Sequence, residues 1–279
     1  MYQQLSLFEP DACQRWQSGT PTWRRPEDGG FTAARYHVVE IDTPTARRFV
    51  ITHHYSRSYP VDRRRYGLIE GDQLLGVAVL GEPMHPKVTG KVFPTLDRRT
   101  TAELSRFVLL DQVPSNAETW LLRRVFGLAA AGGLRGVVAF PDPMPRHNAT
   151  GQLIMPGHVG HIYRAHGGGR YTGRATQRTL TLMPDGRVLS DRSRAKVTGS
   201  ESGAAGVIRG LVAYGATPPN PAAEPRVWLA QALAEIGARR QRHRGNHRFA
   251  WTLGSSRQRR RTPIALPALP YPTTPDATV

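Results

Sequence analysis

The chain has 279 residues, enough for one large domain or two small ones. Its net charge of +17 and sequence pI of about 11.1 indicate a polyanionic partner, with nucleic acid favoured over a membrane surface, or else a basic surface that only aids solubility. The single cysteine, Cys13, excludes an intramolecular disulfide framework and a cysteine-rich zinc module.

The amino-terminal segment, residues 1–34, is polar and contains Pro and Gly, and we interpret it as an irregular arm. Its first residues lack the basic start and apolar run of a secretory signal, and no apolar run in the chain is long enough to span a membrane. The sequence therefore predicts a soluble protein of the cytoplasm that has no membrane partner.

Regular elements begin with a strand over residues 36–41. Thr43-Pro44 then supplies an N-cap and a proline at the first helical position, which predicts a helix that ends near residues 53–56. Two strands within residues 66–80 form a hairpin, and the mostly apolar residues 103–110 are typical of a central strand.

A second helix is predicted from a capping box at Ser115-Asn116-Ala117-Glu118 to Gly132-Gly133, followed by a short buried strand over residues 136–140. Together with the preceding strand these elements make a βαβ unit with two parallel strands. Ligands lie beyond the carboxyl ends of parallel strands, so we expect a site where Asp142 follows the second strand.

The remaining chain alternates short elements with Gly and Pro breaks. We expect a short helix from Gly157 through Tyr163, a strand over residues 176–183, a helix over residues 200–214, a linker over residues 218–225 and an amphipathic helix over residues 226–238.

Nine arginines and no acidic residue lie between Arg239 and Arg261. Aromatic residues alternate with charge over residues 247–251, which favours a further strand and contact with nucleic-acid phosphates over a disordered, solvated tail. The candidate nucleic-acid-binding residues are Arg239, Arg240, Arg242, Arg244, Arg248, Arg257, Arg259, Arg260 and Arg261.

Short motifs recur through the chain in a distinctive order and spacing. They are His54-Tyr55-Ser56, Glu103-Leu104-Ser105-Arg106, Asn116 with a hydroxyl at Thr119, Asp142-Pro143, Gly157-His158, Gly160, Ile162-Tyr163-Arg164-Ala165, Tyr171-Thr172-Gly173, His247-Arg248-Phe249 and Leu269-Pro270-Tyr271-Pro272. In this order the motifs resemble the Mom family of phage DNA-modification proteins, over roughly residues 36–272.

The resemblance implies a transferase that converts adenine in double-stranded DNA to N6-(carbamoylmethyl)adenine and so protects phage DNA from host restriction, in the cytoplasm of the host. It also implies an α/β fold like that of the acyl-CoA-dependent N-acetyltransferases (GNAT), with a mixed central sheet flanked by helices and a basic carboxy-terminal extension. We accordingly divide the chain into the arm, a catalytic domain over residues 35–217, and a Pro-rich linker, helix and Arg-rich DNA-binding tail over residues 218–279.

Family positions carry over to individual residues of this chain. The resemblance implies catalytic roles for Asp142, Tyr163, Arg106 and Thr119, the last standing where the family usually has serine. It implies substrate-binding roles for His54, Tyr55, Ser105, Asn116 and Tyr171.

Transfer to the exocyclic amine of adenine needs a base, an acid and charge stabilisation. Tyr163 is the expected acid, the alternative being a tyrosine packed against the sheet. Asp142 is the expected base or a metal ligand, or else only a turn residue. Because a buried arginine needs a partner, Arg106 is expected to pair with Asp142 or with an anionic substrate group. An aromatic side chain, Tyr55 or Tyr171, would stack on a base flipped out of the duplex.

A metal ion and an acyl donor are candidate co-reactants. His54, Asp142 and His158 are candidate ligands, with iron ahead of zinc, although their spacing matches no strong ligand motif. Acetyl-CoA or a related acyl donor follows from the resemblance. A pyrophosphate-binding pattern can be read at residues 124–129, but it falls inside a predicted helix, where the backbone N–H groups are already bonded.

Extra sequence, about residues 144–155, separates Asp142 from His158, so this loop has to fold away if Asp142 and Tyr163 are to meet. Two other functions remain open. One is an ordinary acetyltransferase acting on a small-molecule or protein amine, and the other is a non-catalytic basic DNA-binding protein.

Overall fold

A computed structural model describes residues 12–83 and 85–276. The chain forms two compact units, and the first consists of Met1–Met144, Pro156–Ala175 and Asn246–Val279. The second consists of Pro145–Met155 and Thr176–Gly245, so the chain leaves the first unit twice and returns each time. The sequence predicts a domain boundary at residue 217, whereas each of these two units joins segments that are far apart in the sequence.

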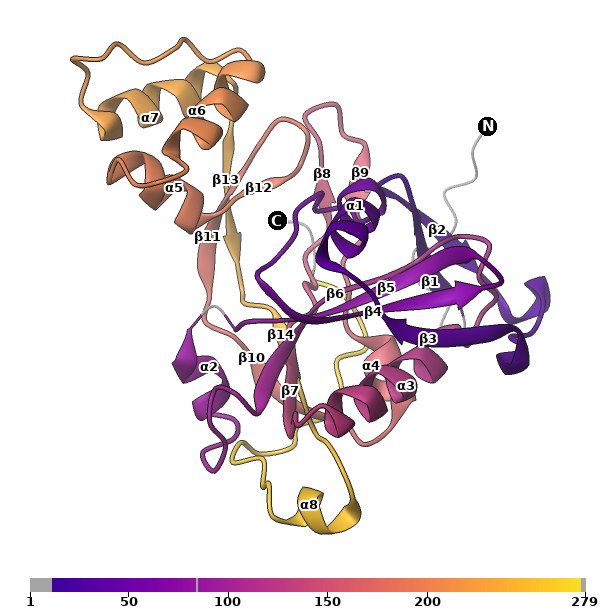
Figure 1. Cartoon of the computed structure of the whole chain (residues 1–279). Helices are drawn as coiled ribbons and strands as arrows, with labels where there is room; N and C mark the ends of the chain where they lie inside the picture. Colours follow the sequence, from indigo (N-terminus) through magenta and orange to yellow (C-terminus); the bar gives the residue numbers. More distant parts are fainter. Residues whose placement is uncertain (1–11, 84, 277–279) are drawn as a thin grey trace. The chain divides into compact units, whose positions relative to one another are not determined.

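A seven-stranded mixed sheet forms the centre of the first unit (Figure 1). Its order is β10-β14-β7-β6-β5-β4-β3; the pair β6–β7 is parallel and the other described pairs are antiparallel. This arrangement confirms the predicted α/β fold with a mixed central sheet. The strands are β3 (Tyr36–Glu40), β4 (Asp62–Glu70), β5 (Gln73–Gly81), β6 (Thr101–Leu109), β7 (Gly136–Ala139), β10 (Arg170–Arg174) and β14 (His247–Thr252).

Helices cover both faces of this sheet, with α1 and α3 on opposite sides of β4 and β5 (Figure 1). The helices of the first unit are α1 (Thr43–His53), α2 (Pro86–Gly90), α3 (Ala117–Ala131), α4 (His161–His166) and α8 (Ser256–Arg260), with 3₁₀ turns η1 (Pro26–Asp28) and η2 (Ala33–Arg35).

Two predicted helix starts differ from the structure. The N-cap of α1 is Asp42, whose carboxylate accepts from the Thr45 N–H, so Thr43 is already helical. The N-cap of α3 is Asn116, in the left-handed region at φ 70°, with no side-chain cap bond. The predicted capping box is wrong because Glu118 is used elsewhere, in a buried ion pair.

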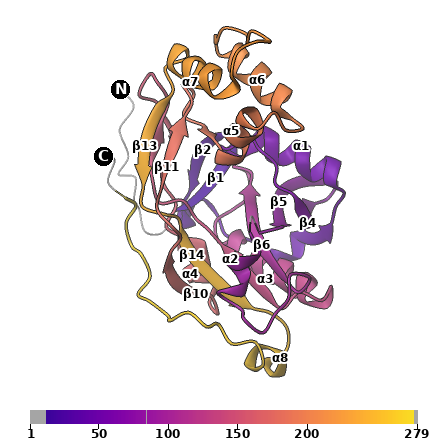
Figure 2. The ribbon, with the colours of Figure 1, turned by 90° about the vertical axis from the view of Figure 1, so that its left-hand side faces the viewer.

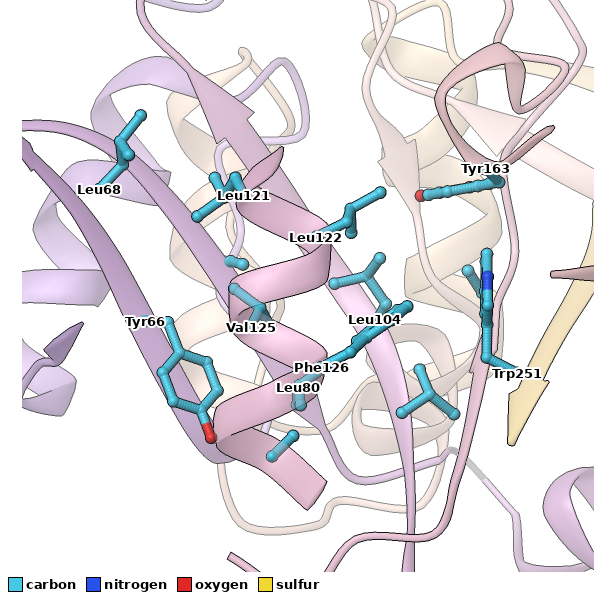
Figure 3. Packing of buried hydrophobic residues seen from close by; sticks show 14 of the residues in the cluster. Tyr66, Leu68, Leu80, Leu104, Leu121, Leu122, Val125, Phe126, Tyr163 and Trp251 are labelled. Atoms are coloured by element: carbon cyan, nitrogen blue, oxygen red, sulfur yellow. The ribbon is translucent and has the colours of Figure 1, made fainter. Parts of the chain in front are cut away.

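The main core lies between α3 and the sheet (Figure 3). Leu121, Leu122 and Val125 of α3 are fully buried and pack with Leu80 and Leu104 of the central strands. Burial of each such side chain is worth about 1.5–3 kcal/mol, so this face of the sheet is rigid.

The amino-terminal arm, predicted as irregular over residues 1–34, contains regular structure in its described part, and residues 1–11 lie outside the described residues. Residues Cys13–Gln17 (β1) and Thr20–Arg24 (β2) form an antiparallel hairpin. Its two-residue turn is Ser18-Gly19, with φ values of 51° and 82°. Positive φ at both turn positions is the geometry that hairpins prefer, and Gly adopts it without strain. Both strands are short and polar, so the sequence lacks the apolar alternation that would predict the hairpin.

Arg15 holds this hairpin against the start of α3 through an ion pair and hydrogen bonds. Its side chain is fully buried and forms an ion pair with Glu118. Arg15 Nε also donates to the Val113 carbonyl at 3.0 Å and Nη2 to the Pro114 carbonyl at 2.6 Å. Burial dominates and lowers the pKa of Arg15 to about 10, so the guanidinium stays charged at neutral pH.

The second unit combines short strands with three helices. Its helical core contains Met183, Leu211, Trp228, Leu229 and Ile236. Residues 239–243, predicted as part of a tail, form a strand paired with β11. The elements are β8 (Arg146–His147), β9 (Leu153–Met155), β11 (Arg178–Leu182), β12 (Val188–Leu189), β13 (Arg239–His243), α5 (Asp191–Thr198), α6 (Ala204–Ala213) and α7 (Pro225–Glu235).

Candidate active site

A β-bulge in β6 organises the candidate site. Glu103 is paired with Gly81 and Leu104 with Leu80, but Arg106 is paired with Val79, so Ser105 is the extra residue. One extra residue shifts the alternation of side chains between the two faces of a strand. Glu103 and Arg106 therefore lie on the same face, opposite the α3 core that contains Leu104.

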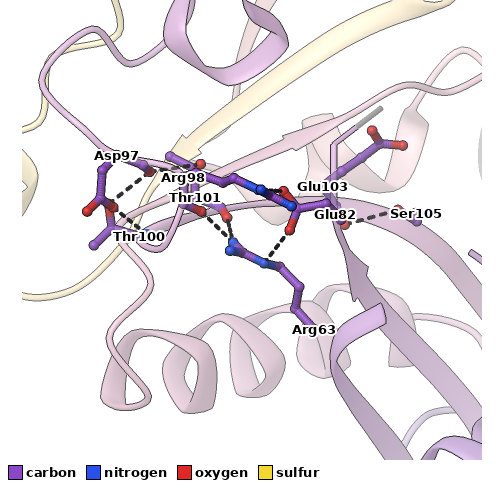
Figure 4. Close-up of polar contacts among 8 residues, drawn as sticks. All are labelled: Arg63, Glu82, Asp97, Arg98, Thr100, Thr101, Glu103 and Ser105. Atoms are coloured by element: carbon purple, nitrogen blue, oxygen red, sulfur yellow. Dashed lines mark hydrogen bonds and ion pairs between the residues drawn. The ribbon is translucent and has the colours of Figure 1, made fainter. Parts of the chain in front are cut away.

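Glu103 is the residue that sequence reasoning missed. Two nearby arginines, Arg63 and Arg98, both form ion pairs with Glu82 (Figure 4). Glu103 forms no ion pair with any residue that the structure describes. Burial raises its pKa from the usual 4.5 to about 7, an effect that the charge of Arg106 opposes. A carboxylate that is half ionised near neutral pH is suited to act as a base. Two sequence signals could have found it, an acidic residue in a mostly apolar strand and the motif Glu103-Leu104-Ser105-Arg106.

Arg106 does not pair with Asp142 as predicted. Its Nε donates to the Ser58 carbonyl at 3.0 Å, Nη2 to the Ser58 hydroxyl at 2.8 Å and Nη1 to the Ser105 carbonyl at 2.6 Å. The bulge is the physical reason, because it places Arg106 on the face of the sheet that α1 covers. Burial lowers the pKa of Arg106, while Tyr55 and Glu103 raise it. The charge of Arg106 in turn opposes the rise in the pKa of Glu103.

Tyr163 lies at the start of α4 and is buried (Figure 3). Its ring packs against Phe249 and Trp251, with centroids 5.3 Å away in each case. Gly160 precedes α4 at φ 87°, and a Cβ there would come within 2.6 Å of the Phe249 ring, so glycine allows this close packing.

The Tyr163 hydroxyl points towards Leu122 of α3 (Figure 3). Across the described ranges it makes no hydrogen bond. Burial raises the pKa of Tyr163 well above 10, and the charges of Tyr55 and Glu103 raise it further. The phenol is therefore protonated at neutral pH, the state that a proton donor requires.

Asp142 follows β7 as expected, and the loop of extra length does fold away. Residues 145–155 belong to the second unit. The chain then returns to the first unit, where the His158 N–H donates to the Asp142 carbonyl at 2.6 Å. Asp142 Oδ1 accepts from the Met144 N–H at 3.0 Å. The His158 ring lies 5.5 Å from that of Tyr163.

His158 is neutral at physiological pH. Burial lowers its pKa to about 4, and His161 lowers it further, whereas Asp142 opposes the shift. Its Nδ1 accepts from the Gly160 N–H at 3.1 Å, which leaves the ring proton on Nε2.

His54 and Tyr55 form a ring cluster with Trp16 of the amino-terminal hairpin. The Tyr55 ring lies 4.2 Å from His54 and 5.1 Å from Trp16. His54 Nδ1 accepts from the Ser56 N–H at 3.1 Å and lies 2.8 Å from the Ser56 hydroxyl. The charge of Tyr55 raises the pKa of both Arg106 and Tyr163.

The other expected site residues have local roles in the structure. The Thr119 hydroxyl donates to the Asn116 carbonyl at 3.3 Å, within the first turn of α3. The Ser105 hydroxyl donates to the Glu103 carbonyl at 3.3 Å. Tyr171 shares a hydrogen bond of 2.9 Å with His247 Nδ1, and its strand, β10, is three strands away from β6, roughly 14 Å.

A metal or coenzyme A fits the described residues poorly. Within residues 12–83 and 85–276, no group of three or more His, Cys, Asp or Glu side chains is arranged to hold a metal ion, so His54, Asp142 and His158 do not form the expected ligand set. The pattern over residues 124–129 lies inside α3, as expected. At the start of α3, Ser115 and Glu118 are buried under the hairpin of Arg15, which leaves no open phosphate cradle.

The nine candidate DNA-binding arginines are divided between the two units. Residues 239–244 belong to the second unit and residues 248–261 to the first. Arg248 joins two strands of the sheet, because its Nε donates to the Thr172 hydroxyl at 2.9 Å and Nη2 to the Thr172 carbonyl at 2.8 Å. In the part of the chain that the structure describes, no helix is long and apolar enough to cross a membrane.

Comparisons with known proteins give one family. Structures similar to the chain include an IAA acetyltransferase from Bacillus cereus (12% identity, TM-score 0.33, 78% of this chain and 99% of that chain). A second is an N-acetyltransferase from Staphylococcus aureus (7%, 0.32, 55% and 92%), and a third is a tandem GNAT protein from the clavulanic acid biosynthesis pathway (11%, 0.40, 79% and 99%). A search of curated proteins found no match. The family model described as the Mom protein family matches residues 35–273, most of the sequence, and the chain therefore belongs to that family.

Proposed function

We propose that this protein is a transferase that modifies adenine in double-stranded DNA at N6, giving N6-(carbamoylmethyl)adenine and protecting phage DNA from restriction. The observation that carries the proposal is that two groups, the Glu103 carboxyl and the Tyr163 phenol, have pKa values raised by burial in a way that suits a base and an acid. One is a carboxylate with a pKa raised to about 7 and the other a phenol kept protonated by burial, and their charges interact. Membership of the Mom family supports the substrate.

The two groups have complementary roles in the transfer. The N6 amine is a weak nucleophile because its lone pair is delocalised into the ring. As the new N–C bond forms, ionised Glu103 accepts the proton that N6 loses. The bond from the transferred carbon to its leaving group breaks, and the Tyr163 hydroxyl donates the proton that the leaving group takes up. Arg106, whose Nε donates to the Ser58 carbonyl, stabilises the negative charge in the site during the transfer.

Glu103 is a stronger candidate base than Asp142. Asp142 Oδ1 already accepts a hydrogen bond from the Met144 N–H, and the Asp142 carbonyl holds His158. Asp142 and the neutral His158 instead position α4 and Tyr163, whose ring lies beside His158.

The ring cluster of Trp16, His54 and Tyr55 supplies a stacking surface for the base. An enzyme that acts on N6 has to reach an atom inside the duplex, and extruded bases are held by stacking against aromatic side chains. Tyr55 interacts electrostatically with both Arg106 and Tyr163, which supports a base stacked there as the substrate of these groups. The alternative function, acetylation of a small-molecule amine, would use the same pair but has no need for a charge of +17.

The decisive experiment is co-expression with a plasmid, followed by digestion of the DNA to nucleosides and mass spectrometry. We expect an adenosine that is heavier by a carbamoylmethyl group. The matched controls are Glu103→Gln and Tyr163→Phe, which should give unmodified DNA from folded protein. Unmodified adenine with the well-expressed wild-type protein would contradict the proposal, and acetylation of a free amine by the purified protein would favour the alternative.

A further inference from the structure

Strands β11 and β13 of the second unit lie side by side as a ribbon (Figure 2). Thr179 is paired with Arg242 and Thr181 with Arg240. Paired residues point to the same face of an antiparallel ribbon, so one face carries both arginines and both threonines, of which Thr179 is exposed and Thr181 is buried. Arg240 and Arg242 are exposed.

The opposite face of this ribbon is covered. Leu180 and Leu182 are 5% and 2% exposed, and their partners across the ribbon are Gln241 and Arg239. Arg239 donates from Nη2 to the His147 carbonyl of the β8–β9 hairpin at 3.2 Å. The inner face thus buries Leu180 and Leu182 but also carries the exposed Arg239, and the outer face carries Arg240 and Arg242.

The charge of the outer face is not neutralised by the protein. Neither strand contains an acidic residue. Arg242 Nη2 donates to the neutral amide of Gln177 at 3.2 Å, and Arg240 has no ion-pair partner among the described residues. Elsewhere in the same unit, Asp185, Asp191 and Glu201 are each paired with an arginine. The arginine charges on the outer face of the ribbon therefore have no acidic counterpart on either of its strands.

Charged residues on a sheet edge also prevent aggregation, which is the simplest alternative. That role accounts for a charge on β13, which is an edge strand. It does not require the charges to share a face with threonine hydroxyls, which also donate to phosphates. Beyond Thr181 the ribbon has only two strands, because β12 pairs with Thr181 and Leu182 alone. The major groove of B-DNA admits a two-stranded ribbon.

We propose that the outer face of this ribbon is a duplex-DNA interface, in which Arg240, Arg242 and Thr179 contact backbone phosphates. The inference rests on the proposed function for its substrate and adds that the second unit is the DNA-binding module. It also divides the nine arginines by role, since Arg248 holds β14 to β10.

The test is binding of the purified full-length protein to a fluorescent duplex of about two helical turns, measured by anisotropy over a series of salt concentrations. The variant is Arg240→Ala with Arg242→Ala. The matched control, Arg209→Ala with Arg226→Ala, removes the same charge from exposed positions on α6 and α7 of the same unit. Circular dichroism and thermal melting establish that each variant is folded.

We expect the dissociation constant of the ribbon variant to rise about 10- to 100-fold, and its salt slope to fall by about 2, because each lost phosphate contact releases one counterion fewer. The control should stay within about threefold of wild type, since long-range charge is screened by salt. Equal losses in both variants, or none in the ribbon variant, would overturn the proposal. So would equally tight binding to phosphatidylserine vesicles that is lost in the ribbon variant.

Nucleoside mass spectrometry separates this inference from the proposed function. DNA binding that depends on Arg240 and Arg242, with no modified adenine, would support the interface and contradict the enzyme activity. Modified adenine, with unchanged binding by the ribbon variant, would contradict the interface alone.

Discussion

Glu103 and Arg106 lie on the same face of β6 although they are three residues apart. In a regular strand they would point to opposite faces, but the bulge at Ser105 reverses the alternation. Both strands around the bulge are packed on α3 through Leu80 and Leu104, so the arrangement is rigid. The candidate base therefore has a fixed cation beside it.

Replacement of the base should abolish the reaction. Because Glu103 has to be ionised to accept the N6 proton, we expect the wild-type modification rate to rise with pH through about 7. Glu103→Gln should lower the rate by about 10²–10⁴ and remove this dependence. The measurement is the amount of modified adenosine formed in vitro between pH 6 and pH 8. An unchanged profile in the variant would assign the pH dependence to another group.

The same substitution should stabilise the folded protein at alkaline pH. Burial raises the pKa of Glu103 from 4.5 to about 7, so its favourable contribution, present below pH 4.5, is lost as pH rises through 7. With ~1.4 kcal/mol per pKa unit, reduced for partial exposure, we expect the advantage of Glu103→Gln to grow by about 2 kcal/mol between pH 5 and pH 8. Urea denaturation at the two pH values measures it, with Glu40→Gln, on the exposed surface, as the control.

Tyr163→Phe tests the acid without disturbing the core. The ring keeps its contacts with Phe249 and Trp251, and the hydroxyl that is removed makes no hydrogen bond to any residue in the described ranges. We expect an unchanged melting temperature and unchanged DNA binding, with a modification rate about 10²–10⁴ lower. Tyr171→Phe is the comparison, because the hydroxyl of Tyr171 bonds to His247. Full activity of Tyr163→Phe would exclude Tyr163 as the acid.

The buried pair Arg15–Glu118 should make the amino-terminal hairpin part of the folded unit. Removing one partner leaves a buried charge, so we expect Arg15→Met and Glu118→Leu each to cost about 3–5 kcal/mol. The double variant should cost less than either single variant, because two apolar side chains leave no charge unpaired. Denaturation of the four proteins completes the cycle. Simple addition of the two losses would show that the groups do not interact.

A second ion pair, between Arg174 and Asp276, holds residues 269–276 of the carboxy-terminal segment in place. Arg174 Nη1 and Nη2 donate to the two carboxylate oxygens of Asp276 at 2.9 and 2.7 Å, and the Asp276 N–H donates to the Pro143 carbonyl beside Asp142 at 3.0 Å. We expect Asp276→Asn to cost about 1–3 kcal/mol locally and to speed hydrogen exchange of residues 269–276 before global unfolding. Asp72→Asn, at an exposed turn, is the control. Equal exchange in both variants would contradict this role.

Much of the fold followed from the sequence because it depends on local patterns. The apolar run of β6, the helix of Leu121 and Val125, and the strand that carries Asp142 at its end are each encoded by neighbouring residues. The motif that contains Glu103 and the position of Tyr163 before a run of glycines were likewise visible in the sequence. These patterns placed the candidate site near the end of two parallel strands.

Other features depended on contacts between distant residues. The hairpin of Arg15 gains its stability from Glu118, the strand of Arg240 from its pairing with Thr181, and the partner of Arg106 was decided by one bulge residue, Ser105. The raised pKa of Glu103 likewise requires burial, which no spacing of residues reveals. Local residue patterns determined which elements form, whereas only tertiary packing decided which side chains meet and which of them lose their water.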